Sequence, residues 1–529
     1  MTDQSTQETL TKLSERTITK MDDQQALEHI GQLVDASHDA RFLRGANRAL
    51  YLLDELSKRN LTEKDGVLVE YFRANAWAAK SHCADIRRSW DWEQPERQEE
   101  ILALSRAVNH PGFMQLGKVR RCQILTNYAN MLNTVGRFID AIAAWDAALA
   151  IEPRFAMARG NRGAGVGHYA RLVADNRERA ILSLHAYDGL MSANADDAFY
   201  DLRNPEGPSH YFRTTAESFK KIVRVQAVRK LQKLDESDLG RSKAERDYRQ
   251  WCLEHRLFLC PLNDLGAVPA AAIDDLRLPA LTEHLDARPG SYLPPPIMGF
   301  FNQMKQEYAS ARFNLFEGMS STRTHYSDRN VSLADTLDYP LFSLASERVR
   351  TAYRIAYSLL DKVAFLVNQY WDLGKVPDRI SFKNVWMVEG KSRLLDKFKA
   401  RENWPLRGLF WLSKELFDDQ LKQTIAADAR ELHEIRNALE HTYLQIVEGW
   451  AKPFMLTPPS SAGFGIAIGS DELEAKAIRV MQIARSALFY ISFAIGVEER
   501  TRRRVSPADY VGEMPLCDLD AKRRRRDPI

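Results

Sequence analysis

The sequence predicts an all-α protein, with helical repeats in its N-terminal half and a helical bundle in its C-terminal half. Apolar residues recur at spacings of three and four through long stretches of the 529-residue chain, as they do on amphipathic helices. One stretch repeats the pattern of a helix, a tight turn and a second helix, and no strand pattern of comparable length competes with these signals. We therefore expect two helical regions without long strands.

The composition is that of a folded protein with several domains. Hydrophobic residues make up 45% of the chain and charged residues 27%, which suits about two or three domains that each bury a core. The formal net charge of +3 is close to neutral, so attraction to nucleic acid must come from local patches. Basic patches occur at residues 500–504 and 522–526, and these either bind phosphates or form a solvated end.

The cysteines and the apolar runs indicate where the protein resides. The 5 cysteines are odd in number and scattered, which is typical of a reducing compartment rather than of a disulfide framework. The N-terminus has no apolar core of a signal peptide, and the longest apolar run, residues 487–497, is too short to span a bilayer. We therefore expect a cytoplasmic protein without a membrane partner.

The clearest repeat is LTNYANMLNTVGRFIDAIAAWDAALAIEP, residues 125–153. Its pattern is carried by Leu125, Tyr128, Ala129, Leu132, Gly136, Phe138, Ala141, Trp145, Ala148 and Pro153. The segment resembles a tetratricopeptide repeat, in which Gly136 turns the chain and Pro153 ends the second helix. Weaker copies on both sides indicate a stack of about three to four repeats over residues 24–190. Such a stack forms a concave surface, which binds a protein or packs against its own chain.

Two further patterns in this half have a structural explanation. The glycines of GNRGAGVG, residues 160–167, lack the lysine of a phosphate-binding loop, and close helix packing explains them better. Cys252, His255 and Cys260 lie close in sequence, but their spacing matches no paired-cysteine zinc module. We therefore predict no metal and no cofactor.

Three long helices are predicted in the C-terminal half: residues 343–374 with Gly374 as the stop, residues 418–447, and residues 471–498. The second of these carries the hexapeptide RNALEH. Its core-facing seam consists of Leu421, Ile425, Ala429, Leu432, Ile435, Leu439 and Ile446. At about 100° per residue, Asn437 and His441 point away from this seam and Arg436 lies on its flank.

Two interpretations of this polar face are open. It is a solvated helix face with an ion pair between Arg436 and Glu440, or it is a site. An imidazole that moves a proton, a cation that stabilises phosphate oxygens and an amide that orients them are the parts needed to split a phosphodiester without a metal. One histidine serves only one side of an in-line displacement, and a symmetric dimer would supply the second imidazole.

The triad Arg436, Asn437 and His441 resembles the RNxxxH signature of HEPN domains, which are small all-α domains. The surrounding segments SDRNVSLADTLDYPLFSLA, YSLLDKVAFLVNQYWDLG and PLRGLFWLSKEL also resemble one bacterial HEPN family with N-terminal helical repeats. This resemblance implies a metal-independent endoribonuclease in which the substrate 2′-hydroxyl attacks the adjacent phosphate. It also implies that His441 acts as general base or acid, that Arg436 stabilises the transition state, and that Asn437 orients them.

The resemblance further implies a protein that cuts RNA as a toxin or an antiviral defence effector, and the need for a second imidazole predicts a homodimer. The repeat half would then respond to a protein or phage-derived trigger. The alternative is a non-catalytic interaction protein in which the HEPN-like domain only dimerises or binds nucleotide or RNA. The predicted organisation is an N-terminal segment (1–23), tetratricopeptide-like repeats (24–190), a connector (191–300), a HEPN-like helical domain (301–500) and a basic tail (501–529).

Weaker candidates accompany the triad. Asp361 and Lys362 form a charged pair amid apolar residues, which is either a buried ion pair or a support for the catalytic residues. Glu440 is a third supporting candidate, as the helix partner of Arg436. In the loop THYSDRN, His325 and Arg329 either cap the local structure or contact the substrate.

Overall fold

The computed structural model confirms the all-α fold class. It describes residues 2–83, 90–201, 205–222, 224–225, 228–229, 238–283, 296–336, 338–391, 393–417, 427–454, 465–505, 510–512 and 516. The chain forms two compact units that are not continuous in sequence. The first contains residues 1–171, 179–232 and 386–431, and the second contains residues 172–178, 233–385 and 432–529.

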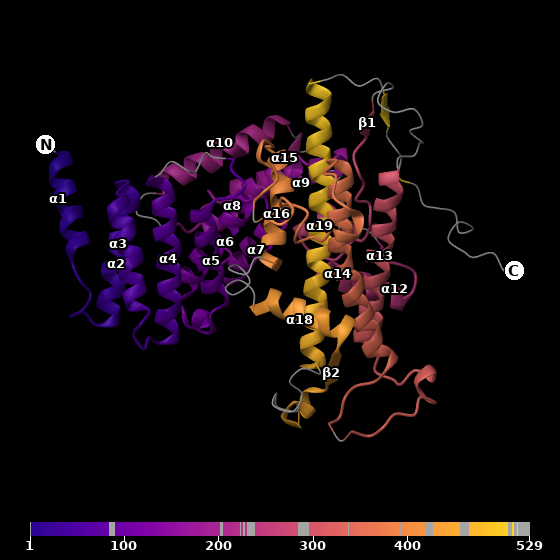
Figure 1. The fold of residues 1–529 in the computed structure, drawn as a ribbon. Helices are drawn as coiled ribbons and strands as arrows, with labels where there is room; N and C mark the ends of the chain where they lie inside the picture. The colour runs from indigo at the N-terminus through magenta and orange to yellow at the C-terminus, as the bar shows by residue number, and fades with distance from the viewer. Residues whose placement is uncertain are drawn as a thin grey trace. The chain divides into compact units, whose positions relative to one another are not determined.

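The first unit contains a row of helices, α1 to α8, in which successive members pack against one another (Figure 1). Its helices are α1 (Thr2–Glu15), α2 (Asp23–Asp39), α3 (Leu43–Leu56), α4 (Glu63–Cys83), α5 (Pro95–Asn109), η2 (Pro111–Gln115), α6 (Lys118–Thr134), α7 (Phe138–Ile151), α8 (Ala156–Ala170), α9 (Asn176–Ser192), α10 (Glu206–Ile222), α15 (Asp396–Lys399) and α16 (Trp404–Phe417). The first residues of α9 belong to the second unit. The tetratricopeptide character of this row stays a prediction.

The turn between α6 and α7 is covered by the start of α16. Gly136 makes this turn at a φ of +94°, a backbone conformation that favours glycine. The indole nitrogen of Trp404 donates to the carbonyl of Asn133 at 2.8 Å, and the Arg407 guanidinium donates to the carbonyl of Thr134 at 2.6 Å. These bonds satisfy the carbonyl groups that remain at the C-terminal end of α6.

The glycines of residues 160–167 lie within α8, as the packing explanation requires. A Cβ atom on Gly165 would lie 2.4 Å from the Trp145 ring, and one on Gly163 would lie 2.7 Å from the backbone nitrogen of Leu190. Larger side chains would therefore push α8 away from α7 and α9. This segment is a helix-packing surface and not a phosphate-binding loop.

The second unit is built on three long helices, α13, α14 and α19, which run alongside one another (Figure 1). Its helices are α12 (Lys243–Glu254), η4 (Pro261–Leu265), η5 (Pro269–Ala271), α13 (Pro296–Ser320), η6 (Tyr326–Asp328), α14 (Leu344–Tyr370), η7 (Pro377–Arg379), α18 (Ala427–His441), η8 (Gly449–Phe454) and α19 (Ser470–Val505). The first five residues of α18, 427–431, belong to the first unit. Two strand pairs complete the second unit: β1 (Leu281–Glu283) with β4 (Tyr510–Gly512), and β2 (Tyr443–Val447) with β3 (Gly465–Gly469).

Helix α14 begins and ends close to its predicted limits. Ser343 and Ser346 form a reciprocal capping box at its start. Beyond its end, Gly374 has a φ of +70° and turns the chain. The prediction of one long helix over residues 343–374 is therefore confirmed apart from its last turn.

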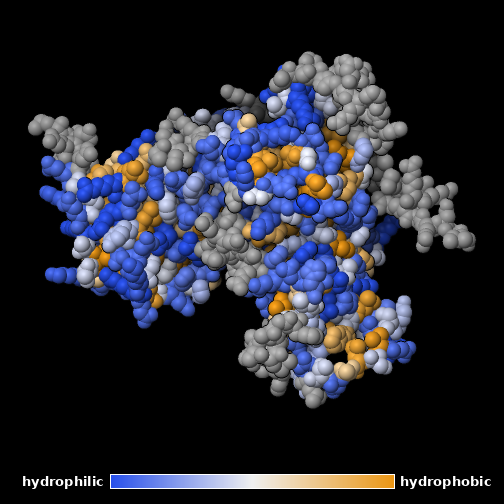
Figure 2. Space-filling model, viewed as in Figure 1, coloured by the Kyte–Doolittle hydropathy of each residue, from blue (hydrophilic) through white to orange (hydrophobic). Residues whose placement is uncertain are grey.

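Helix α19 is longer than predicted, and its apolar character is explained by burial. Its residues 470–504 are long and apolar enough to cross a membrane by length and composition alone. However, 89% of its most apolar window is buried inside the structure, as in the central helix of a domain. Most of the surface visible in Figure 2 is hydrophilic.

The predicted helix over residues 418–447 is wrong at its C-terminal end. Helix α18 stops at His441, and residues 443–447 form strand β2, paired in parallel with β3. Leu444, Ile446 and Val447 of this strand are buried. Ile446 lies seven residues after Leu439, so it fits both a helical seam and a strand. The segment forms a strand because it pairs with residues 465–469, in a register that places residue 443 opposite residue 465, 22 residues away.

We predict that Gly136→Ala destabilises the chain by more than about 2 kcal/mol. The positive φ is strained for alanine, and the new Cβ would lie 2.2 Å from the Trp404 carbonyl oxygen. Thermal unfolding followed by circular dichroism would show a lower Tm. The matched control is Gly207→Ala in α10, where a Cβ meets nothing within 4 Å, and which should leave the Tm unchanged or slightly raised. Equal Tm values for the two variants would contradict the packing of this turn.

Candidate functional site

Helix α18 is held against the second unit by one apolar face. Leu432, Ile435 and Ala438 are buried, at 2%, 2% and 4% exposure. The hydroxyl of Tyr353 on α14 donates to the Leu432 carbonyl at 2.6 Å. Leu439 of the predicted seam is only half-buried, so the seam passes through Ala438 instead. Leu421, Ile425 and the side chain of Ala429 lie outside the described residues.

The triad occupies the other side of α18. The Arg436 guanidinium donates to the side-chain oxygen of Asn437 at 3.1 Å, and its central carbon lies 5.9 Å from the centre of the Tyr357 ring. His441 is the last residue of the helix and is exposed. The cation is therefore braced between an amide and an aromatic ring, while the imidazole is accessible to a substrate.

Asp361 lies one turn after Tyr357 on α14 and faces the same region. Its carboxylate accepts the backbone N–H of Phe382 at 2.9 Å. Burial raises the pKa of Asp361 above its ordinary value of 3.8, although this hydrogen bond and the positive charge of Arg436 oppose the rise. Asp361 therefore supplies a carboxyl group near the Arg436 guanidinium, as a supporting role requires.

Lys362 does not pair with Asp361, so the predicted alternative of an ion pair between these neighbours is wrong. The Lys362 ammonium pairs with Glu307 on α13. Adjacent residues on a helix point about 100° apart, which directs the two charges toward different neighbours. Lys362 thus joins α14 to α13, and no contact within the described part of the chain connects it with the triad.

The predicted ion pair between Arg436 and Glu440 is also wrong. Among the described residues, no ion pair or hydrogen bond joins these two side chains, and Glu440 is exposed. Arg436 turns instead across the helix toward Asn437 and Tyr357. An ion pair on a helix surface contributes only about 0.3–0.5 kcal/mol, which a tertiary contact easily exceeds.

Sequence reasoning missed His433 and Tyr357 as neighbours of the triad. The Tyr357 hydroxyl lies 3.2 Å from Nδ1 of His433, and burial raises the pKa of Tyr357, so that its hydroxyl keeps its proton. His433, Asn437 and His441 follow one another at four-residue intervals, which places them along one side of α18. That spacing was visible in the sequence, but the tyrosine 76 residues away was not.

The loop residue His325 caps the local structure. Nδ1 of His325 accepts the backbone N–H of Ser327 at 3.2 Å and caps η6. Asp328 in the same turn accepts the backbone N–H of Leu344 at 3.0 Å, at the start of α14. Arg329 is exposed, and a substrate contact for it stays a prediction.

Of the two basic C-terminal patches, the one at residues 500–504 lies within the described residues. In the last turns of α19, Arg502 donates to Glu499 at 3.2 Å and Arg503 donates to the Thr282 hydroxyl at 3.0 Å. These arginines therefore tie the end of the helix to its own unit. The run over residues 522–526 lies outside the described residues.

Exposed aromatic residues lie beside strand β2, which follows His441. Tyr339, Phe342 and Trp450 are 49%, 46% and 63% exposed, and the rings of Tyr339 and Trp450 are 5.3 Å apart. The backbone N–H of Leu341 donates to the carbonyl of Ile446 in β2 at 2.7 Å, which holds this segment in place. We refer to Tyr339, Phe342 and Trp450 as the aromatic patch.

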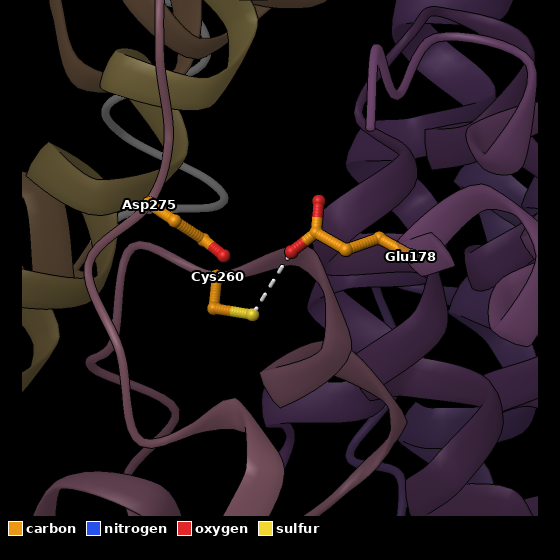
Figure 3. A group of neighbouring side chains, drawn as sticks. All are labelled: Glu178, Cys260 and Asp275. Atoms are coloured by element: carbon orange, nitrogen blue, oxygen red, sulfur yellow. Dashed lines mark hydrogen bonds between the residues drawn. The ribbon is translucent and has the colours of Figure 1, made fainter. Parts of the chain in front are cut away.

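A separate group of metal-ligand types lies at another part of the second unit. The ligand atoms of Glu178, Cys260 and Asp275 all lie within 4.8 Å of one another (Figure 3). Burial raises the pKa of Glu178 to about 8 and also raises the pKa values of Cys260 and Asp275. Cys252 and His255, which precede Cys260 in sequence, are not part of this group.

The comparison with family models places a known domain over most of this helical unit. Residues 290–498 match the family model described as LA2681-like HEPN. These residues belong to the HEPN family, which indicates a nuclease or an RNA-related role. The comparisons with curated proteins and with solved structures returned no match.

We predict that Asp361→Asn raises the Tm at pH 7. The folded chain holds the Asp361 proton to a higher pH than the unfolded chain does, because burial raises the pKa above 3.8. The stability that this proton contributes is complete below pH 3.8 and is lost as the pH rises through the folded pKa. Asparagine stays neutral, so the difference in Tm should shrink as the pH is lowered toward 4. A lower Tm of the variant at pH 7 would contradict this, and would mean that attraction to Arg436 outweighs desolvation.

Proposed function

We propose that this protein is a metal-independent endoribonuclease. In the reaction, the 2′-hydroxyl of the substrate attacks the adjacent phosphorus, the bond from phosphorus to the 5′-oxygen breaks, and a 2′,3′-cyclic phosphate and a 5′-hydroxyl remain. One imidazole accepts the proton of the 2′-hydroxyl, and an acid returns a proton to the 5′-oxygen. The nucleophile belongs to the substrate itself, and a guanidinium balances the phosphate charge, so the chemistry needs no metal ion.

The residues of the triad have distinct roles in this proposal. His441 transfers the proton, because its imidazole is exposed and an imidazole can both accept and donate a proton. Arg436 binds the phosphate oxygens as negative charge develops on them. Asn437 orients Arg436 through the hydrogen bond between their side chains, and Tyr357 and Asp361 limit the positions that the guanidinium can adopt.

One observation carries the proposal: Arg436 and His441 lie on the accessible part of α18 while the guanidinium is braced from two sides. A solvated helix face would not need to brace its arginine, because water satisfies it. The HEPN match over residues 290–498 supports the same chemistry. The competing interpretation, a scaffold that only binds nucleotide or RNA, needs the positive charge but has no use for a proton-transferring His441.

The aromatic patch supports a dimer with a composite cleft. Large aromatic residues exposed at 46–63% are uncommon on a free surface and are enriched at interfaces. The patch adjoins β2, which begins two residues after His441. A two-fold contact at this end of the unit would bring the His441 side chains of two protomers toward one cleft, where one could act as base and the other as acid.

In the cell, we propose that the enzyme acts as a toxin or an antiviral defence effector that cuts RNA in the cytoplasm. The helices of the first unit would then receive a protein or phage-derived trigger. The row of consecutively packed helices supports such a role, because stacked helical hairpins present extended surfaces for protein ligands.

We predict that His441→Ala lowers the rate of RNA cleavage at least about 100-fold without lowering the Tm, because the lost group transfers protons and is exposed. Cleavage of an end-labelled single-stranded RNA should leave 2′,3′-cyclic phosphate ends in the wild type, and a substrate with a 2′-deoxy sugar at the cut should resist. The control is Glu440→Gln, which changes an exposed neighbour and should keep full activity. RNA that both proteins bind but neither cuts, also on expression in cells, would favour the non-catalytic alternative.

A second prediction concerns the composite cleft. A heterodimer of wild-type and His441→Ala protomers, purified with two different tags, should keep less than about a tenth of the wild-type rate, because general acid or base catalysis is lost in the shared cleft. Two independent sites would instead keep half of the rate. A tagged heterodimer of wild-type and Glu440→Gln protomers controls for the purification. A monomer in solution that still cuts RNA would rule out the shared cleft.

A further inference from the structure

Three segments of the second unit place the thiol of Cys260 and the carboxyl groups of Glu178 and Asp275 close together. Figure 3 shows the side chains of Glu178, Cys260 and Asp275 pointing toward one another. The Cys260 thiol donates to Oε1 of Glu178 at 3.3 Å, and Cys260 is 1% exposed. In a tetrahedral zinc site with bonds of about 2.3 Å to sulfur and about 2.1 Å to oxygen, these two ligand atoms lie about 3.6 Å apart. The side chains are therefore already near the spacing of a coordination shell.

The protein neutralises this group only weakly, because burial raises the pKa of Asp275 more than the positive charge of Lys305 lowers it. Glu178 is 9% exposed, and Oδ1 of Asp275 is buried without a hydrogen-bond partner. Within the described part of the chain, no lysine, arginine or histidine forms an ion pair with Glu178 or Asp275. The preceding residue, Asp274, does have a cationic partner, because its carboxylate accepts two hydrogen bonds from the Arg312 guanidinium, at 2.8 Å and 2.7 Å. A buried and a half-buried carboxyl group that form no ion pair are suitable ligands for a bound cation.

The segments that carry the ligands are held rigidly. The buried Arg485 guanidinium donates to the carbonyls of Phe258 and Cys260, at 2.7 Å and 3.1 Å, and pairs with Asp264 at 2.7 Å. The backbone N–H of Leu276, next to Asp275, donates to the carbonyl of Leu259 at 2.9 Å. These contacts are the kind of support that fixes ligands before a metal binds.

Glu178 has its own support in the first turn of α9. Asp175 caps this helix, and its carboxylate accepts the backbone N–H groups of Arg177 and Glu178 at 2.9 Å and 3.0 Å. Glu178 and Asp275 also line a cavity of about 580 Å³, together with Arg277, Ser492 and Arg500. The cavity provides a path for an ion and room for a water molecule as a fourth ligand.

We propose that Glu178, Cys260 and Asp275 bind a single divalent metal ion of the zinc type. Two carboxylates alone would suit Mg²⁺ or Ca²⁺, but a thiolate selects a softer ion such as Zn²⁺. On binding, the S–H bond of Cys260 breaks, its proton passes to solvent, and a bond from sulfur to the metal forms. The ion would join the start of α9 to the segments around residues 260 and 275. This site does not depend on the proposed RNA cleavage.

The full-length protein tests the proposal directly. Purified in Zn²⁺ and then desalted, the wild type should retain zinc, measured by mass spectrometry of the metal, and its Tm should rise when zinc is added to the metal-depleted protein. Cys260→Ser, Asp275→Asn and Glu178→Gln should each weaken zinc binding at least about 10-fold. The control is Cys83→Ser, which removes a thiol outside the group and should bind zinc like the wild type.

Cobalt identifies the thiol ligand. Titration of metal-depleted wild type with Co²⁺ should produce a thiolate-to-cobalt charge-transfer absorption in the near ultraviolet, which Cys260→Ser should lose and Cys83→Ser should keep. If Cys260→Ser fails to fold, as judged by circular dichroism, Asp275→Asn decides, because Asp275 is only partly buried. Equal zinc content in the wild type and Asp275→Asn, or bound cobalt without a thiolate band, would overturn the proposal.

Discussion

The second unit depends on the burial of α14 on several sides. This helix packs along α13 and along α19, and at its end the Tyr370 hydroxyl donates to the buried carboxylate of Glu499 at 2.5 Å. Its remaining side carries Tyr353, Tyr357 and Asp361 toward α18. A helix enclosed in this way cannot shift without breaking contacts with several neighbours, because interiors are close-packed. The position of α18, and with it the geometry of the triad, follows from this constraint.

Buried polar groups in this unit fall into two kinds. Arg485 with Asp264, and Arg312 with Asp274, are ion pairs whose guanidinium groups also donate to backbone carbonyls. Such satisfied networks hold loops in one conformation. Among the described residues, Glu178 and Asp275 form no ion pair, and Asp361 is kept beside Arg436 although burial disfavours its charge. Groups that cost stability in this way are concentrated where proteins bind ligands or carry out chemistry.

The sequence could predict the features of the site that depend on local helix geometry. Arg436, Asn437 and His441 lie on one helix away from its apolar seam because residue spacing along a helix determines direction. The long helix α14, its serine cap and the glycine beyond its end were predictable for the same reason. The partners of these residues were not. Asp361 and Lys362 are adjacent in sequence, yet their contacts lie on different elements, at Phe382 and Glu307.

By itself, the sequence determined the helical class, the triad and the side of the helix on which it lies, because hydrophobic periodicity and short-range spacing are local properties of the chain. Only the tertiary structure decided that residues 443–447 form a strand, that Arg436 contacts Asn437 and Tyr357 rather than Glu440, and that Cys260 meets Glu178, 82 residues away. These outcomes depend on which distant segments pack together. Packing and desolvation decide which of several possible partners a side chain contacts. The spacing of residues along the chain carries no information about either.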